Sequence, residues 1–295
     1  MLLVITSSSF MEFYCNASVA SLGSGVRLPY AYYCPPASSA LVVGADGGAA
    51  VGASAGGGAA QRLHMILGHG LGAKNPANTG YMDDKWIALV AEQAYASGLQ
   101  PVVYTARGHK GSQGWEDSAE SDPDQFTWNR LSQDMMDLAT QELALERVVV
   151  GGSSMGSATA LLCVMNNPPE LFLGLIMVRP PTAWETRKAR RKFLLSSANK
   201  CQESSPEGDA SHWVLRGAAN GDLPSTTDDK VDETYGRVTC PTLILAVRND
   251  DAHPLATAEA LHAVLPHSIL HIAEDLGDAS EKWPAVIREF SSSLV

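Results

Sequence analysis

The chain has 295 residues, of which 45% are hydrophobic and 18% charged, so it is long enough to bury a sizeable core. Its formal net charge of −11 opposes attraction to the phosphates of nucleic acids and to anionic lipid surfaces. These numbers favour a soluble globular protein of enzyme size and exclude nucleic acid as an expected partner.

Cysteine usage and the first residues indicate the compartment. The five cysteines are scattered and never form a C-x-x-C pair, so neither a disulfide framework nor a zinc site is expected. The apolar start MLLVITSSSF lacks the basic residues of a signal peptide and is too short to span a membrane. We therefore expect a cytoplasmic protein without a membrane span, and the sequence leaves its oligomeric state open.

The N-terminal part combines strand patterns with a low-complexity stretch. Residues Val26 to Tyr33 alternate well enough for a strand. Residues 38 to 60 are almost entirely Ala, Gly, Val and Ser, which is typical of a surface insertion. A short apolar run from Arg62 to Leu67 then leads into His69-Gly70-Leu71-Gly72, where glycines permit the tight turn that ends a strand.

Apolar runs alternate with helical patterns along the rest of the chain. The runs are nearly continuous, as in parallel strands buried on both faces, and they are Pro101 to Thr105, Arg147 to Gly151, Leu173 to Val178, Thr242 to Val247 and Ile269 to Ala273. The helical patterns are Asp84 to Ser97, Leu131 to Glu146, Ser157 to Met165, Ala256 to Val264 and Glu281 to Phe290. This order predicts an α/β fold with a doubly wound, mostly parallel sheet flanked by helices.

One segment breaks the alternation. Residues 181 to 237 are polar and contain no clear buried strand, so we expect a helical cap inserted between two strands. The basic run Arg187 to Lys192 in this segment is interpreted as a solvated helix face rather than an anion site. The predicted division is therefore an N-terminal strand region with the insertion (1–60), an α/β core in two parts (61–180 and 238–295) and the cap (181–237).

The strongest chemical signal is VVVGGSSMGSATAL, where Gly152 to Gly156 match G-x-S-x-G between a buried strand and an Ala-rich helix. On so sharp a turn the serine side chain is pushed clear of the backbone, and the glycines remove side chains that would collide. The N-terminus of the following helix favours developing negative charge. Although Gly/Ser-rich turns also occur without catalysis, the spacing selects Ser154 over Ser153 as a nucleophile.

Four other segments occur in the order found in the α/β-hydrolase superfamily. Together with this motif they make the chain resemble that superfamily from about Gly25 to the end, apart from the insertion. His69 to Gly72 looks like the HGxG loop of that family. Arg107 to Ser112 is similar to its RGHGxS loop, with an extra Lys110. Gln125 to Asp137 looks like the helix before the nucleophile strand. The segment from Cys240 to Pro254 resembles a "P-T-L-I then D-x-x-x-P" block, in which the aspartate is Asp250.

The resemblance implies an oxyanion hole made by the backbone N–H groups of Leu71 and Met155. Each such donor contributes roughly 3–4 kcal/mol of transition-state stabilisation. The resemblance also implies that His69 and Gly70 lie at the substrate pocket. His69 is interpreted as a structural loop residue rather than a base, and His109 as a histidine that fixes its own loop.

The acid of a catalytic triad is expected on the loop after Thr242 to Val247, which offers Asp250 and Asp251. Asp250 has the family spacing to Pro254 and is therefore preferred. Its role would be to orient and charge-balance an imidazolium. The alternative is an exposed acidic turn without a catalytic role.

The histidine departs from the family pattern. It usually follows the last strand as a Gly-His pair, but Gly277-Asp278 stands there. His253 lies on the loop of Asp250 at the carboxyl edge of the sheet, where ligand sites gather, and is the working candidate for the base. Because the two residues are so close in sequence, His253 is expected to act without an orienting carboxylate. Three nearby histidines are interpreted as structural: His262, His267 and His271.

The main hypothesis is a serine-dependent hydrolase of an ester, thioester or similar acyl bond in a small or medium apolar substrate. Ser154, His253 and Asp250 are its catalytic candidates, and no metal or organic cofactor is implied. The alternative is a ligand-binding or regulatory protein on a catalytically impaired hydrolase scaffold. A third, weaker hypothesis is a lyase or transferase that uses the same pocket. An imidazole within hydrogen-bond reach of Ser154 distinguishes the first two.

Overall fold

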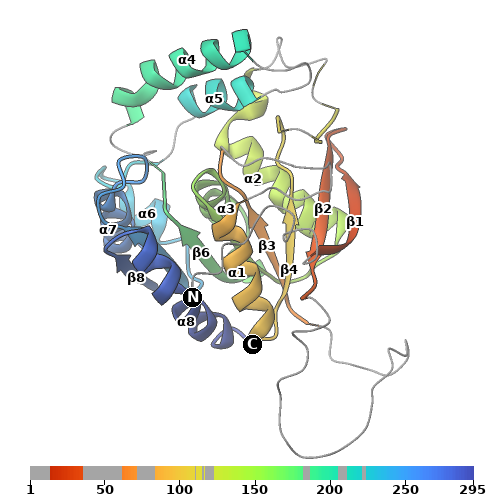
Figure 1. The fold of residues 1–295 in the computed structure, drawn as a ribbon, viewed down its shortest axis with the longest axis vertical. Helices are drawn as coiled ribbons and strands as arrows, with labels where there is room; N and C mark the ends of the chain where they lie inside the picture. Colours follow the sequence, from red (N-terminus) through yellow and green to blue (C-terminus); the bar gives the residue numbers. More distant parts are fainter. Residues whose placement is uncertain are drawn as a thin grey trace, which may run out of the picture.

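The computed structural model describes residues 14–35, 62–71, 84–109, 111–114, 116, 123–181, 187–204, 211–220 and 224–295. Within these ranges the strands are β1 (Tyr14–Ser21), β2 (Arg27–Tyr33), β3 (His64–Gly68), β4 (Gln100–Tyr104), β5 (Val148–Ser153), β6 (Phe172–Val178), β7 (Thr242–Val247) and β8 (Ser268–Ala273). They form one sheet in the order β1-β2-β4-β3-β5-β6-β7-β8 (Figure 1). β2 pairs antiparallel with β1 and β4, and the other neighbours are parallel. The predicted fold class is confirmed.

Helices cover both faces of the sheet. On one face lie α1 (Lys85–Ala96) and α8 (Leu276–Ser292), joined by the rings of Trp86 and Trp283, whose centroids are 4.8 Å apart. On the other face α2 (Trp128–Asp137), α3 (Met155–Asn166) and α7 (Leu255–Val264) share a second core. The remaining helices are η4 (Pro123–Phe126), η5 (Leu138–Glu142), η6 (Pro169–Leu171), α4 (Arg187–Ser204), α5 (Ser211–Asn220) and α6 (Val231–Tyr235). No helix among the described residues is both long and apolar enough to cross a membrane.

Burial of the strands follows their place in the sheet. Every residue of β5 and β7 is buried, as their apolar runs predict. The prediction of burial on both faces is wrong for β8, where Ile269 is 52% and Ile272 36% exposed. β8 is one of the two edge strands, so it lacks a neighbouring strand on one side. Continuous hydrophobicity in the sequence does not distinguish an edge strand from a central one.

The last helix begins earlier than its apolar pattern indicates. α8 starts at Leu276 rather than at Glu281. The Asp275 side chain accepts hydrogen bonds from the backbone N–H groups of Gly277 (2.8 Å) and Asp278 (2.9 Å), which caps the helix. Only Glu274 and Asp275 therefore separate β8 from the first turn of α8.

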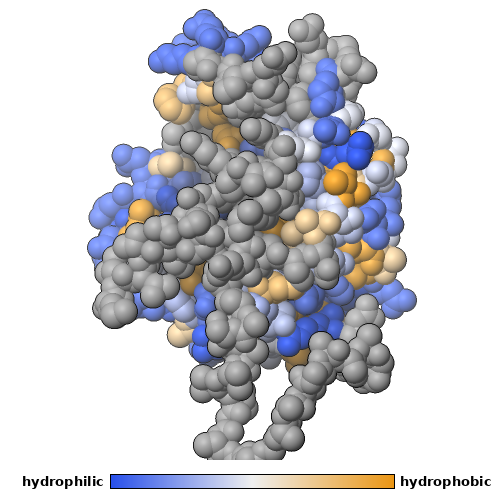
Figure 2. Space-filling view, turned by 45° about the vertical axis from the view of Figure 1, so that its right-hand side comes forward, coloured by the Kyte–Doolittle hydropathy of each residue, from blue (hydrophilic) through white to orange (hydrophobic). Residues whose placement is uncertain are grey.

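The segment between β6 and β7 contains helices α4, α5 and α6, as expected from its sequence. α4 and α5 lie together at the top of Figure 1, beyond the carboxyl ends of the parallel strands. Arg191 and Lys192 of α4 are exposed, and the coloured atoms at the upper left of Figure 2 are mostly hydrophilic, with a hydrophobic patch below them. That residues 181–237 form a separate cap remains a prediction.

Some sequence expectations need correction or cannot be compared. Cys34 is disulfide-bonded, whereas Cys163, Cys201 and Cys240 are free. No disulfide framework was expected from the sequence, but scattered spacing does not exclude the single bridge at Cys34. The Ala/Gly-rich stretch 38–60, Gly72 and Lys110 lie outside the described residues, so the expectations for them stay predictions.

Candidate active site

Ser154 stands at the sharp turn between β5 and α3. Its φ of 52° lies in the left-handed region that non-glycine residues seldom adopt. The Ser154 N–H donates to the carbonyl of Val178 on β6 (2.9 Å), which ties this strained turn to the neighbouring strand. The residue is partly exposed although its neighbours are buried. The strand–turn–helix context predicted from the sequence is present.

The motif glycines permit a close approach of backbone segments. A Cβ atom at Gly152 would overlap the backbone of Gly156. A Cβ atom at Gly156 would overlap the carbonyl of Gly68, which pairs with Gly152 in the sheet. Helix α3 can therefore begin directly against β3 and β5 only because both motif positions lack a side chain.

His253 lies on the loop between β7 and α7, at the same edge of the sheet. Its Nε2 is 2.9 Å from Ser154 Oγ, and its Nδ1 is 3.0 Å from Asp250 Oδ2. If Nδ1–H donates to the carboxylate, Nε2 is left to accept the serine proton. The side chains of His253 and Asp250 are 13% and 12% exposed, so both interactions are largely shielded from water. The structure brings the three catalytic candidates into one hydrogen-bonded chain.

A tight turn allows one short loop to supply both residues. The His253 N–H donates to the Asp250 carbonyl at 3.1 Å. Asp250 Oδ1 accepts from the backbone N–H groups of Ala252 (3.1 Å) and His253 (3.2 Å), and this leaves Oδ2 for the imidazole. The expectation that His253 lacks an orienting carboxylate is therefore wrong. The turn brings the imidazole ring back to the Asp250 side chain, which also accepts the hydrogen bonds that close the turn.

Arg179, the residue directly after β6, also binds Asp250. Its Nε donates to Oδ2 at 2.8 Å, and its Nη2 contacts the same oxygen. Burial raises the pKa of Asp250, but the Arg179 hydrogen bond and the charges of His253 and Arg179 outweigh it, so the pKa lies below its ordinary value. The carboxylate is therefore ionised at neutral pH and can balance an imidazolium.

His69 fixes the loop beside Ser154. The Ala106 N–H donates to His69 Nε2 (3.0 Å), so Nδ1 carries the ring proton and donates it to the Gly70 carbonyl (2.9 Å). Burial, with the His109 ring as a smaller cause, lowers the pKa of His69 well below its ordinary value and keeps the ring neutral. Because the C=O and N–H of one peptide point in opposite directions, this contact also orients the Leu71 N–H.

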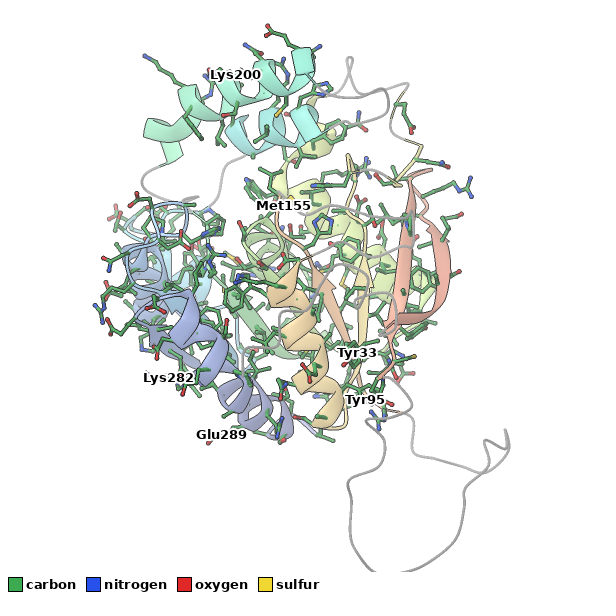
Figure 3. The ribbon with its side chains drawn as sticks, viewed as in Figure 1. Tyr33, Tyr95, Met155, Lys200, Lys282 and Glu289 are labelled. Atoms are coloured by element: carbon green, nitrogen blue, oxygen red, sulfur yellow. The ribbon has the colours of Figure 1, made fainter. Side chains whose placement is uncertain are left out.

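Two backbone N–H groups at the site have no protein acceptor among the described residues: those of Leu71 and Met155. Met155 is the first residue of α3, where N–H groups have no partner within the helix. Figure 3 labels it at the end of α3 that faces α4 and α5. A Cβ atom at Gly70 would lie 3.6 Å from Ser154 Cβ, so the loop that carries Leu71 runs beside the serine. Free donors in this place suit a developing oxyanion.

The segment after β8 has other contacts. Asp278 accepts from the Glu274 N–H (3.0 Å) and forms an ion pair with Lys282 (2.7 Å). Figure 3 shows Lys282 on α8, well apart from Met155. Of the other candidates, Asp251, His262, His267 and His271 are all exposed. The histidine at the serine therefore comes from the loop after β7.

Sequence reasoning missed two residues that hold the site. Arg179 carried a usable signal, because it follows a central strand at the carboxyl edge. Asp84, the N-cap of α1, accepts a hydrogen bond from the Gly70 N–H (2.9 Å). No sequence pattern links Asp84 with Gly70, because residues 71–83 separate them.

A parallel sheet that presents a serine on a strand-to-helix turn defines the α/β-hydrolase class of folds. A family model described as the alpha/beta hydrolase family matches residues 65–286. The chain belongs to the alpha/beta hydrolase family.

Solved structures agree on the fold. An esterase from Exiguobacterium antarcticum is 16% identical with a TM-score of 0.65, and the match covers 94% of this chain and 99% of that one. A hydrolase from Pseudomonas aeruginosa is 15% identical with a TM-score of 0.62, covering 95% and 98%. The thioesterase domain from the curacin biosynthetic pathway is 13% identical with a TM-score of 0.59, covering 94% and 99%. No curated protein matches the chain.

Proposed function

We propose that the protein is a serine hydrolase of ester, thioester or similar acyl bonds in small or medium-sized apolar substrates. The observation that carries this proposal is the position of His253, 2.9 Å from Ser154 Oγ and 3.0 Å from Asp250 Oδ2. A general base must lie within hydrogen-bond reach of the proton that it takes, and an ionised carboxylate behind it favours its protonation.

The reaction would proceed in two halves. Ser154 Oγ attacks the acyl carbon while its proton moves to His253 Nε2, and the Leu71 and Met155 N–H groups bind the oxyanion. The intermediate then collapses: the bond to the leaving alcohol or thiol breaks, and that group takes the proton from Nε2. In the second half a water molecule, deprotonated by His253, attacks the acyl-serine; the bond between the acyl carbon and Oγ breaks, and Nε2 returns the proton to Ser154 Oγ as the acid is released.

Two observations support the choice of substrate. The similar structures include an esterase and a thioesterase domain, which favours acyl esters and thioesters. Helix α5 covers the loop next to the site, because a Cβ atom at Gly108 would meet Val214 of α5 at 2.5 Å. On the same loop, His109 Nε2 lies 3.2 Å from the Leu71 carbonyl. Helices over the serine would enclose a substrate of limited size and exclude water from it.

The test is covalent labelling with a fluorophosphonate probe, combined with hydrolysis of p-nitrophenyl esters and of short acyl thioesters. Ser154→Ala should abolish labelling and lower turnover by about 10⁵-fold to 10⁶-fold. Ser153→Ala is the matched control, because it removes the neighbouring hydroxyl and should leave labelling in place. Equal labelling of Ser154→Ala and the parent protein would refute the proposal.

The alternative of a ligand-binding protein without turnover depended on the missing Gly-His pair. An imidazole at hydrogen-bond distance from Ser154 removes that reason, and no other observation favours it.

A further inference from the structure

Strained backbone gathers at one edge of the sheet. Four non-glycine residues in the described ranges have positive φ, and three of them follow the adjacent strands β5, β6 and β7: Ser154 (52°), Arg179 (51°) and Asn249 (61°). Such conformations are strained and persist where the surroundings fix them, often at functional sites. The first residue is the candidate nucleophile, and the third precedes Asp250. The second has no role in the mechanism above.

Arg179 is held firmly toward Asp250. Its backbone N–H donates to the Leu245 carbonyl on β7 (2.7 Å), and its guanidinium lies 5.8 Å from the centre of the Trp86 ring. Its side chain is only 18% exposed. Its Nε and Nη2 both donate to Asp250 Oδ2, the oxygen that also contacts His253 Nδ1.

This sharing has an electrostatic consequence. When His253 accepts the serine proton, Asp250 must balance a new positive charge, but the same carboxylate oxygen already binds a permanent one. The guanidinium therefore opposes protonation of the imidazole. Loss of Arg179 would not release Asp250, because Oδ1 still accepts from Ala252 and His253.

We infer that Arg179 is a positioning residue that acts through Asp250 and keeps His253 in its proton-accepting form at mildly acidic pH. This inference rests on the proposed function. It concerns the pH range of the reaction rather than the identity of the nucleophile.

Other charged or titratable groups around His253 do not duplicate this effect. Asp251 on its own loop is exposed. Asp84 is engaged with the Gly70 N–H and with the start of α1, and His69 on the same side is neutral. Arg248, also at the end of β7, is exposed and pairs with Glu274 (2.9 Å). None of these four groups shares a carboxylate oxygen with the imidazole, as the Arg179 guanidinium does.

The experiment measures the rate of fluorophosphonate labelling against pH for the 295-residue chain and its variants. Arg179→Asn and Arg179→Gln remove the charge, and asparagine tolerates positive φ, so the test does not depend on one variant folding. Without the cation the imidazole takes up a proton at higher pH, so the acid limb should move up by about one pH unit. On the acid limb, the labelling rate of each variant, expressed as a fraction of its own plateau rate, should then be about tenfold lower than that of the parent at the same pH.

Two control variants separate charge from geometry. Arg179→Lys keeps the charge and should leave the acid limb in place, even if the plateau rate falls. Arg248→Gln removes one positive charge from the same edge without a contact to Asp250, and its profile should equal that of the parent. An unmoved or lowered limb in both neutral Arg179 variants, or an equal shift in Arg248→Gln, would overturn the inference.

A second readout separates this inference from the proposed function. The His253 ring can be titrated by NMR in histidine-labelled protein, with its signal assigned by its loss in His253→Gln. An upward shift of the His253 titration in Arg179→Asn supports the inference even if the fluorophosphonate probe does not react with the parent. That failure of the probe to react would contradict only the proposed hydrolase activity. Labelling with an unshifted His253 titration would contradict only the role of Arg179.

Discussion

Two short segments end adjacent strands at the same edge of the sheet and differ in their contacts. The β7 loop (Arg248 to Pro254) turns tightly and sets His253 against Ser154, with Asp250 behind the imidazole. The β8 turn (Glu274 to Asp278) enters α8 at once, with Asp275 as its N-cap and Asp278 bound to Lys282. The family usually takes its histidine from the second segment, whereas in the proposed mechanism this chain takes it from the first.

In the proposed mechanism, the edge of the sheet at which a catalytic group lies matters more than its order in the chain. Parallel strands deliver all their carboxyl ends to one edge, so the segments that follow different strands begin on the side of the sheet where the serine lies. Catalytic triads are accordingly recognised by geometry and roles rather than by sequence position. The β8 turn is then free to serve as the start of a helix.

Substitution of the histidine should have the largest effect. His253→Ala removes the base and is expected to lower kcat for p-nitrophenyl esters by about 10⁵-fold to 10⁶-fold. Asp278→Ala, the matched change in the β8 turn, should leave kcat within about twofold because it does not touch the serine. Comparable losses in both variants would contradict the assignment of the base.

Substitution of the acid should have the next largest effect. Asp250→Asn keeps the shape but removes the charge behind the imidazole, so kcat should fall by about 10⁴-fold. Asp251→Asn, at the exposed neighbouring position, should change it by less than about twofold. Steady-state kinetics of the two variants would decide, and the reverse order would exclude Asp250.

A histidine returned to the family position should have no benefit. Asp278→His places an imidazole in the first turn of α8, where the native side chain contacts the Glu274 N–H and Lys282. We expect no gain in turnover from this change, either alone or combined with His253→Ala. A faster Asp278→His enzyme would show that the β8 turn still reaches the serine and that the chain is a degraded hydrolase.

The smallest effect concerns stability. Asp275→Ala removes the N-cap of α8 and should lower the free energy of unfolding by about 1 kcal/mol, because two backbone N–H groups lose their acceptor. Urea unfolding measures this loss, and kcat/KM should stay at the parent value. A large loss of activity without a loss of stability would mean that the β8 turn has a direct role at the site.

The sequence predicted the fold well because its signals are local. Continuous apolar runs located the parallel strands, and the glycine spacing around Ser154 reflects a steric need that the structure shows at Gly152 and Gly156. The edge position of β8 was not predictable from its hydrophobicity. The early start of α8 was missed because it depends on a cap at Asp275, outside the apolar pattern.

The site was only partly predictable, because its geometry depends on turns and on contacts between distant segments. Asp250 and His253 were identified as candidates, but the turn that lets them act together was not. Arg179 joins the site from a third strand through one carboxylate oxygen. Such pairings follow from the order of strands in the sheet, which no single motif records.

The most direct measurement is a double-mutant cycle of Asp250→Asn and His253→Ala, with kcat/KM determined for the parent, both single variants and the double variant. If Asp250 acts only through His253, the double variant should be no slower than His253→Ala alone, within about twofold. If Asp250→Asn instead lowers the rate of His253→Ala by about tenfold or more, the two residues act independently and do not form one triad with Ser154.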